Sequence, residues 1–132
     1  MKRGVRLLNG RKQVLIQDEV TASAPIQWRM HTNATVTANG ATATLERDGK
    51  TLEMTILNAG DATFSTMDAV RLASSPEPLV PDQENPGITI VLIDLEAGTH
   101  TLEVLFNPQW EGVDFVTPST VALDDWSLTS HN

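Results

Sequence analysis

Apolar and polar residues alternate with a period of two along most of this chain, which is the pattern of half-buried β-strands. The clearest case is the stretch 26–33, where Trp28 and Met30 share one side and Arg29 and His31 share the other. The same alternation predicts further strands near residues 5–8, 14–20, 35–38, 41–46, 50–57, 101–106 and 121–128. No stretch shows a convincing helical stripe, so little helix is expected.

Three tight-turn signals separate these strands. Asn39-Gly40, Asp48-Gly49 and the segment 58–61 each favour a hairpin, because their residues tolerate positive φ. Their spacing is typical of an antiparallel meander. The fold class predicted for residues 1–132 is therefore a single all-β domain, an antiparallel β-sandwich of about eight or nine strands.

Two segments depart from simple alternation. Residues 87–94 are apolar on both faces, which indicates a central strand that is covered on both sides. Residues 73–86 contain four prolines and several acids without periodicity. Because proline cannot donate to a ladder, this stretch is predicted to be a long loop, either functional or mobile.

The net charge of −8 is unevenly distributed. Residues 1–50 hold eight Lys/Arg and four Asp/Glu, whereas residues 51–132 hold Arg71 against thirteen acids. An acidic half of this size repels polyanions, so nucleic acid is not an expected partner. Either the two halves lie side by side and compensate each other, or the basic half faces an acidic glycan or an acidic partner domain.

Several other classes of protein are disfavoured. No run of about 18 apolar residues occurs, so no membrane span is expected. There is no cysteine, so disulfides and thiolate metal sites are absent and the compartment stays open. The basic start Met1-Lys2-Arg3 is not followed by the apolar region of a signal peptide.

An ordered set of short motifs, spread over residues 3–108, resembles the C-terminal β-sandwich of heparinase II/III-like polysaccharide lyases. These motifs are Arg6 with Val14-Leu15-Ile16-Gln17-Asp18-Glu19, Trp28-x-Met30-His31-Thr32, Gly49-Lys50-x-Leu52, Asn85-x-Gly87, and Leu102-x-Val104 followed by Pro108.

The resemblance implies a bacterial protein, in the periplasm or secreted if it belongs to a lyase, in which an N-terminal α/α-toroid performs β-elimination on a uronate-containing polysaccharide such as a glycosaminoglycan or alginate. The family's tyrosine has no counterpart here, because the chain has no tyrosine. Its zinc-binding histidine motifs are also absent from this sequence. The resemblance therefore implies no catalytic residue, no metal and no cofactor in this chain.

Three residues are candidates for carbohydrate contact. Arg29 and His31 are expected to point outward together from one strand, where an arginine fork could bind a glycan carboxylate. Trp110, in an irregular segment after Pro108, is the best candidate for an exposed stacking platform. The alternatives are a plain polar face or a contact with a missing domain for Arg29 and His31, and ordinary packing for Trp110. Trp28 is expected in the core.

The remaining ionisable residues favour structural roles. Adjacent strand residues point to opposite faces, so Asp18 and Glu19 cannot flank one bond and the inward one needs an ion-pair partner. The same holds for Asp124-Asp125. His100 is expected in a solvated turn and His131 in the terminal tail, too scattered for a zinc site. Residues 82–84 offer only a weak calcium motif.

Two functions follow as hypotheses. The first is a non-catalytic sandwich that packs against the catalytic toroid and helps to shape the polysaccharide cleft. The second is a stand-alone carbohydrate-binding module without lyase activity; a purely structural interaction module is a third.

Overall fold

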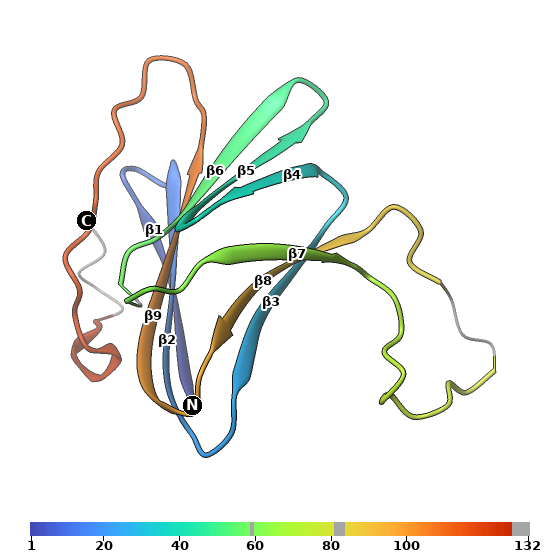
Figure 1. The fold of residues 1–132 in the computed structure, drawn as a ribbon. Coiled ribbons are helices and arrows are strands. Elements are labelled where there is room, and N and C mark those ends of the chain that lie inside the picture. The colour runs from blue at the N-terminus through green and yellow to red at the C-terminus, as the bar shows by residue number, and fades with distance from the viewer. Residues whose placement is uncertain (59, 81–83, 128–132) are drawn as a thin grey trace.

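The computed structural model describes residues 1–58, 60–80 and 84–127, and within them nine strands form two antiparallel sheets (Figure 1). The larger sheet has the order β1-β2-β9-β6-β5-β4. Its strands are β1 (Lys2–Leu8), β2 (Gln13–Ala22), β9 (Gly98–Pro108), β6 (Lys50–Ile56), β5 (Thr42–Arg47) and β4 (Thr35–Asn39). The smaller sheet has the order β3-β8-β7, with β3 (Ile26–Thr32), β8 (Thr89–Leu95) and β7 (Phe64–Asp68). The predicted antiparallel β-sandwich is confirmed.

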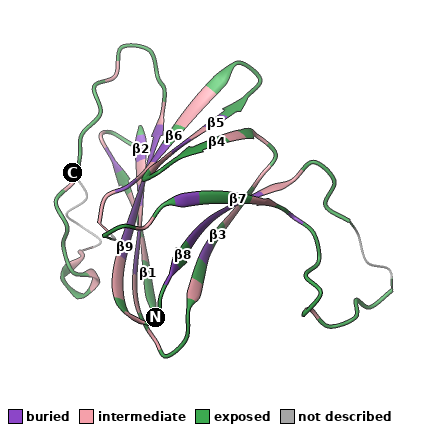
Figure 2. Cartoon of the chain, viewed as in Figure 1, coloured by how far each residue is buried: buried purple, intermediate pink, exposed green. Residues whose placement is uncertain are grey.

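The main core lies between the two sheets. Trp28 from β3, Ile93 from β8, and Met54 and Val104 from the larger sheet pack in one buried cluster. Trp28 is 7% exposed, so its predicted place in the core is confirmed. The central strands β8 and β9 carry long runs of buried residues, as Figure 2 shows. The prediction that residues 87–94 form a covered central strand is also confirmed.

Two of the three predicted hairpins exist. The turn at Asn39-Gly40 joins β4 to β5, and the turn at Asp48-Gly49 joins β5 to β6. The glycines in these turns have φ angles of 60° and 71°, which favour a residue without a Cβ. The prediction of a third hairpin at residues 58–61 was wrong, because the strands before and after them, β6 and β7, belong to different sheets. The chain crosses between the layers there instead of folding back.

Asp18 forms the predicted structural ion pair. Its side chain is 5% exposed on the inner face of β2, and Arg3 on β1 donates to its two oxygens at 2.6 and 2.7 Å. The hydrogen bond with Asp18 raises the pKa of Arg3 above its usual value, although burial opposes this. Glu19 points to the opposite face, as the alternation requires.

The prediction of a strand at residues 121–128 was wrong for residues 121–127, and residue 128 lies outside the described residues. Residues 109–127, the C-terminal strap, cross the outer face of β1, β2 and β9 without joining the sheet and contain only a short 3-10 helix, η1 (Leu123–Asp125) (Figure 1). Side chains of β2 hold the strap. Gln13 pairs with the main chain of Val116 through two hydrogen bonds of 3.0 Å, and the Gln17 amide donates to the carbonyl of Val121 at 2.8 Å.

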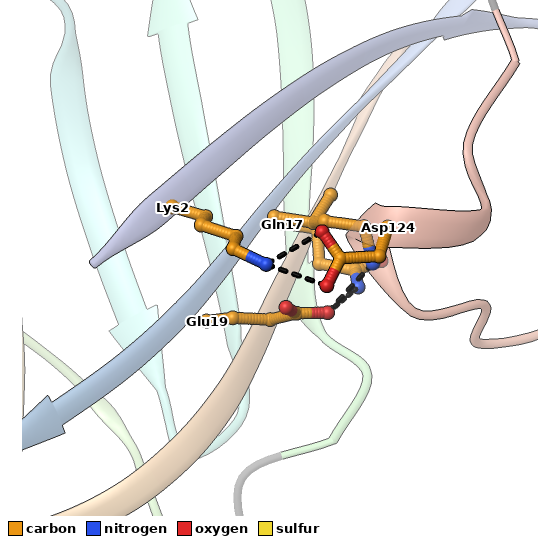
Figure 3. A network of polar contacts seen from close by, with 5 residues as sticks. Lys2, Gln17, Glu19 and Asp124 are labelled. Carbon is orange, nitrogen blue, oxygen red and sulfur yellow. Dashed lines mark hydrogen bonds and ion pairs between the residues drawn. The ribbon is translucent and has the colours of Figure 1, made fainter.

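Ion pairing adds to this attachment. Figure 3 shows Lys2, Gln17, Glu19 and Asp124 drawn together where β1 and β2 meet η1. The Lys2 ammonium lies 2.5 Å from an Asp124 oxygen, and Glu19 accepts the main-chain N–H of Leu123 at 2.7 Å. The hydrogen bond with Asp124 raises the pKa of Lys2 above 10.5, against a smaller opposing effect of desolvation. Charges from the two halves of the sequence are therefore partly compensated here.

Candidate functional site

A groove of about 680 Å³ lies between the outer face of the three-stranded sheet and the segment that joins β7 to β8. The sheet side comes from β3 and β8, and the other side comes from residues 69–76 and 84–86. A volume of this size is within the range of small-molecule sites. Arg29 and His31, the two candidates predicted from the alternation, both line it.

The strand pattern explains why these two side chains face the groove. Trp28 and Met30 pack into the core from the inner side of β3, so Arg29 and His31 project from the outer side. In the pairing of β3 with β8, Arg29 stands opposite Leu92 and His31 stands opposite Ile90. Leu92 and Ile90 belong to a small buried cluster with Ala69, and Ile90 and Ala69 give the groove part of its apolar lining.

Arg29 is oriented by a chain of hydrogen bonds along the same face. Its Nε and Nη2 atoms donate to Oε1 of Gln27 at 2.8 and 2.5 Å. The Nε2 atom of Gln27 donates in turn to Oδ1 of Asp94 on β8 at 2.7 Å. Gln27 is neutral, and Arg29 forms no ion pair with any residue in the described ranges. The positive charge of Arg29 is thus held in place without being neutralised directly.

Arg71 is a third cation of the groove that sequence reasoning missed. Its guanidinium donates to the carbonyls of Pro76 at 3.0 Å and Ser75 at 2.8 Å and pairs with Glu77 at 3.1 Å. These contacts link Arg71 to residues 75–77 of the same loop, and Arg71 itself lines the groove. One signal could have found it, because Arg71 is the single basic residue among residues 51–132.

Two arginines, Arg29 and Arg71, line the groove together with the imidazole of His31, and Glu84 is the carboxylate among the described lining residues. Arg71 is already paired with Glu77, whereas Arg29 forms no ion pair with a described residue. An anionic ligand could therefore pair with Arg29 without displacing a carboxylate.

Trp110 is not part of this groove. It follows the C-terminal end of β9, a central strand of the larger sheet, and its indole N–H donates to the carbonyl of Lys12 at 3.1 Å. Its exposed fraction of 55% agrees with the predicted exposed position. The three candidate carbohydrate contacts thus fall into two separate places, with Arg29 and His31 together and Trp110 apart.

The other predicted ionisable sites are structural or lie outside the described residues. His100 lies in β9 and not in a turn, is half-buried, and has its Nε2 atom 2.8 Å from the carbonyl of Glu96. Asp82 and Gln83 of the weak calcium motif and His131 lie outside the described residues. In the parts of the chain that the structure describes, no three His, Asp or Glu side chains are grouped to hold a metal ion. The described residues also include no helix long and apolar enough to cross a membrane.

No family model matches this chain, and no curated protein matches it. The chemistry of the groove therefore has to be inferred from its own residues.

Proposed function

We propose that this domain is a non-catalytic β-sandwich that binds a uronate-containing polysaccharide in the groove lined by Arg29, His31 and Arg71. In this proposal it serves a heparinase II/III-like lyase by packing against an α/α-toroid and helping to shape the cleft. The observation that carries the proposal is the unneutralised Arg29, fixed by Gln27 beside a second arginine.

A uronate carboxylate suits this arrangement. With Nε and Nη2 of Arg29 engaged by Gln27, Nη1 remains to donate to the ligand. Hydrogen bonds to charged groups are shorter and stronger than neutral ones. Both arginines are exposed enough for salt to weaken their attraction to an anion, so each contributes about 1 kcal/mol, a factor of about five in affinity.

The proposal assigns no β-elimination to this groove. Abstraction of a proton next to a uronate carboxylate requires a positioned base and a positioned acid. The chain has no tyrosine, and the one histidine of the groove has no second titratable base beside it except Glu84 among the described lining residues. Binding without turnover is the function that these residues support.

The alternative is a stand-alone carbohydrate-binding module. It uses the same groove and the same arginines, and it differs only in needing no toroid. Adding a uronate hexasaccharide to the isolated chain tests the groove in both cases, whereas co-purification with a toroid-bearing lyase distinguishes them.

The test uses two-dimensional NMR of the full chain titrated with an alginate hexasaccharide. We expect shifts of the Arg29, His31 and Ile90 amides, and about fivefold weaker binding for Arg29→Ala and for Arg71→Ala. Arg47→Ala is the matched control, because it removes an exposed arginine from β5, outside the groove. Equal loss in all three variants, or no shift at the groove amides, contradicts the proposal.

A further inference from the structure

Trp110 presents a fixed aromatic face at a place remote from the groove residues. Its main-chain N–H donates to the carbonyl of Pro108 at 2.8 Å, and its indole N–H donates to the carbonyl of Lys12 at 3.1 Å. The exposed fraction of Trp110 is 55%. The two bonds hold the backbone and the N–H edge of the indole, so the ring is restrained although the residue is exposed. An aromatic side chain that is both exposed and restrained loses little entropy when it binds.

The turn that receives this bond is strained. Asn9, Gly10 and Arg11 have φ angles of 51°, 64° and 68°, a run of left-handed residues in which two carry side chains. The strap clamps the turn from its other side, because the Asn9 amide donates to the carbonyl of Asp114 at 2.8 Å. Strain that the surroundings maintain in this way is a common property of functional turns.

The turn that Trp110 contacts carries exposed charged residues. Arg11 and Lys12 are exposed, and neither forms an ion pair with a residue in the described part of the chain. Glu111 follows Trp110 directly and is also exposed. Charged residues of both signs are therefore neighbours of Trp110, either in the chain or in the turn that its indole contacts.

We propose that Trp110, together with Arg11, Lys12 and Glu111, is a second saccharide-binding site that stacks one pyranose ring, neutral or acidic. The C–H face of a pyranose is apolar and faintly positive, which matches the negative face of the indole. The charged side chains supply hydrogen bonds to the ring hydroxyls. This site goes beyond the groove, since its main interaction is stacking and needs no carboxylate.

The polar surroundings favour a sugar over a docking protein. Aromatic hot spots of protein interfaces are ringed by neighbours that lose their water when the complex forms. Here the residues beside Trp110 in sequence are Gln109 and Glu111, and the turn that it contacts carries Arg11 and Lys12. Hydroxyl groups can use these side chains, whereas an apolar protein surface would have to desolvate them.

Two probes of equal length separate the two sites: cellohexaose, which is neutral, and an alginate hexasaccharide, which is anionic. The indole N–H resonance of Trp110, identified by its absence in Trp110→Phe, reports on the second site. We expect both sugars to shift it, and we expect cellohexaose binding to persist when salt rises from about 0.1 M to about 1 M, where charge attraction is screened.

Variants complete the test. Trp110→Ala is expected to weaken cellohexaose binding about tenfold or more, the usual effect of losing one stacking platform, and Trp110→Phe is expected to restore most of it. Arg29→Ala and Arg71→Ala leave cellohexaose binding unchanged if the sites are separate. An indole resonance that moves with neither sugar in the unmodified chain overturns the proposal and leaves Trp110 as a protein contact. Loss of cellohexaose binding in Arg29→Ala overturns the independence of the site.

Discussion

Gln27 and Asp94 face each other across β3 and β8, joined by a 2.7 Å hydrogen bond from the Gln27 amide to the Asp94 carboxylate. This bond decides which end of the Gln27 side chain points at Arg29. With the amide nitrogen engaged by Asp94, the carbonyl oxygen faces the guanidinium and accepts from it twice. Gln27, which is not among the residues that line the groove, therefore orients Arg29, which lines it.

The first prediction follows from this relationship. Gln27→Met keeps the length of the side chain and removes its hydrogen bonds, so Arg29 is released to more rotamers. We expect about threefold to fivefold weaker binding of an alginate hexasaccharide with an unchanged free energy of unfolding, because the residue is exposed. NMR titration and urea denaturation measure the two quantities. Asp94→Asn keeps a side-chain acceptor for Gln27 and should bind nearly as well, and unchanged affinity in Gln27→Met would show that Arg29 needs no orientation.

The second prediction concerns the buried ion pair. Arg3→Ala leaves the Asp18 carboxylate, 5% exposed, without its guanidinium. Fully buried pairs cost about 3–5 kcal/mol when one partner is removed, and since Arg3 itself is 45% exposed we expect about 1–3 kcal/mol. Urea denaturation at constant m measures this. The variant Arg3→Ala/Asp18→Asn should recover part of the loss, and a single-variant cost below about 0.5 kcal/mol would mean that water already compensates Asp18.

The sandwich and the inward or outward direction of most strand residues could be predicted because one face of each strand is buried and the side-chain period is two. The strand β7 escaped this reasoning. Its two apolar residues, Phe64 and Met67, are three positions apart, and they contact different clusters. It pairs with β8 through a long sequence separation that no local pattern reveals.

The opposite error occurred at the C-terminal end. Val121 and Leu123 alternate like strand residues, yet their main chain bonds to Gln17 and Glu19 side chains instead of to a neighbouring strand. The alternation of apolar and polar residues does not reveal whether the main chain of a segment bonds to side chains or to a neighbouring strand. Only part of the groove could be predicted from the sequence. Arg29 and His31 follow from the period of β3, whereas Arg71 reaches the groove through the path of a loop.

The third prediction is a pH dependence at the edge of the larger sheet. Since the pKa of Lys2 in the folded state lies above 10.5, its contribution to stability is fully present below 10.5 wherever Asp124 is ionised, and it is lost as pH rises through the raised value. A titration of the Lys2 side-chain carbon by NMR should give a midpoint above 10.5. In Asp124→Ala the midpoint should fall, and an identical midpoint in both proteins would refute the pairing in solution.

The fourth prediction tests how β2 holds the strap. Gln13 is fully buried and makes three hydrogen bonds, two with Val116 and one of 2.6 Å with Asn107. Gln13→Met removes all three at nearly constant volume, and we expect a loss of about 2–3 kcal/mol. Hydrogen exchange should show much faster exchange of the Val116 amide. Gln17→Met is the control, because it should loosen the strap near Val121 and leave Val116 protected.

The last prediction concerns Gly4, where the strap approaches β1 most closely. A Cβ at this position would lie 2.5 Å from Cδ2 of Leu123 and 2.7 Å from Cζ3 of Trp126. The glycine has no left-handed φ, so the effect of Gly4→Ala comes from crowding and not from the backbone. We expect a cost of about 1–3 kcal/mol, measured by urea denaturation.

A second background separates crowding from other causes. In a protein that carries Leu123→Ala and Trp126→Ala, the space beside residue 4 is open, so Gly4→Ala should become nearly neutral and the coupling should appear as a non-additive term. A cost that persists in this background would mean that the strap does not lie against β1 at Gly4. In that case the packing of the strap against β1 would not exist in solution, and the contact of Lys2 with Asp124 would not be supported by it.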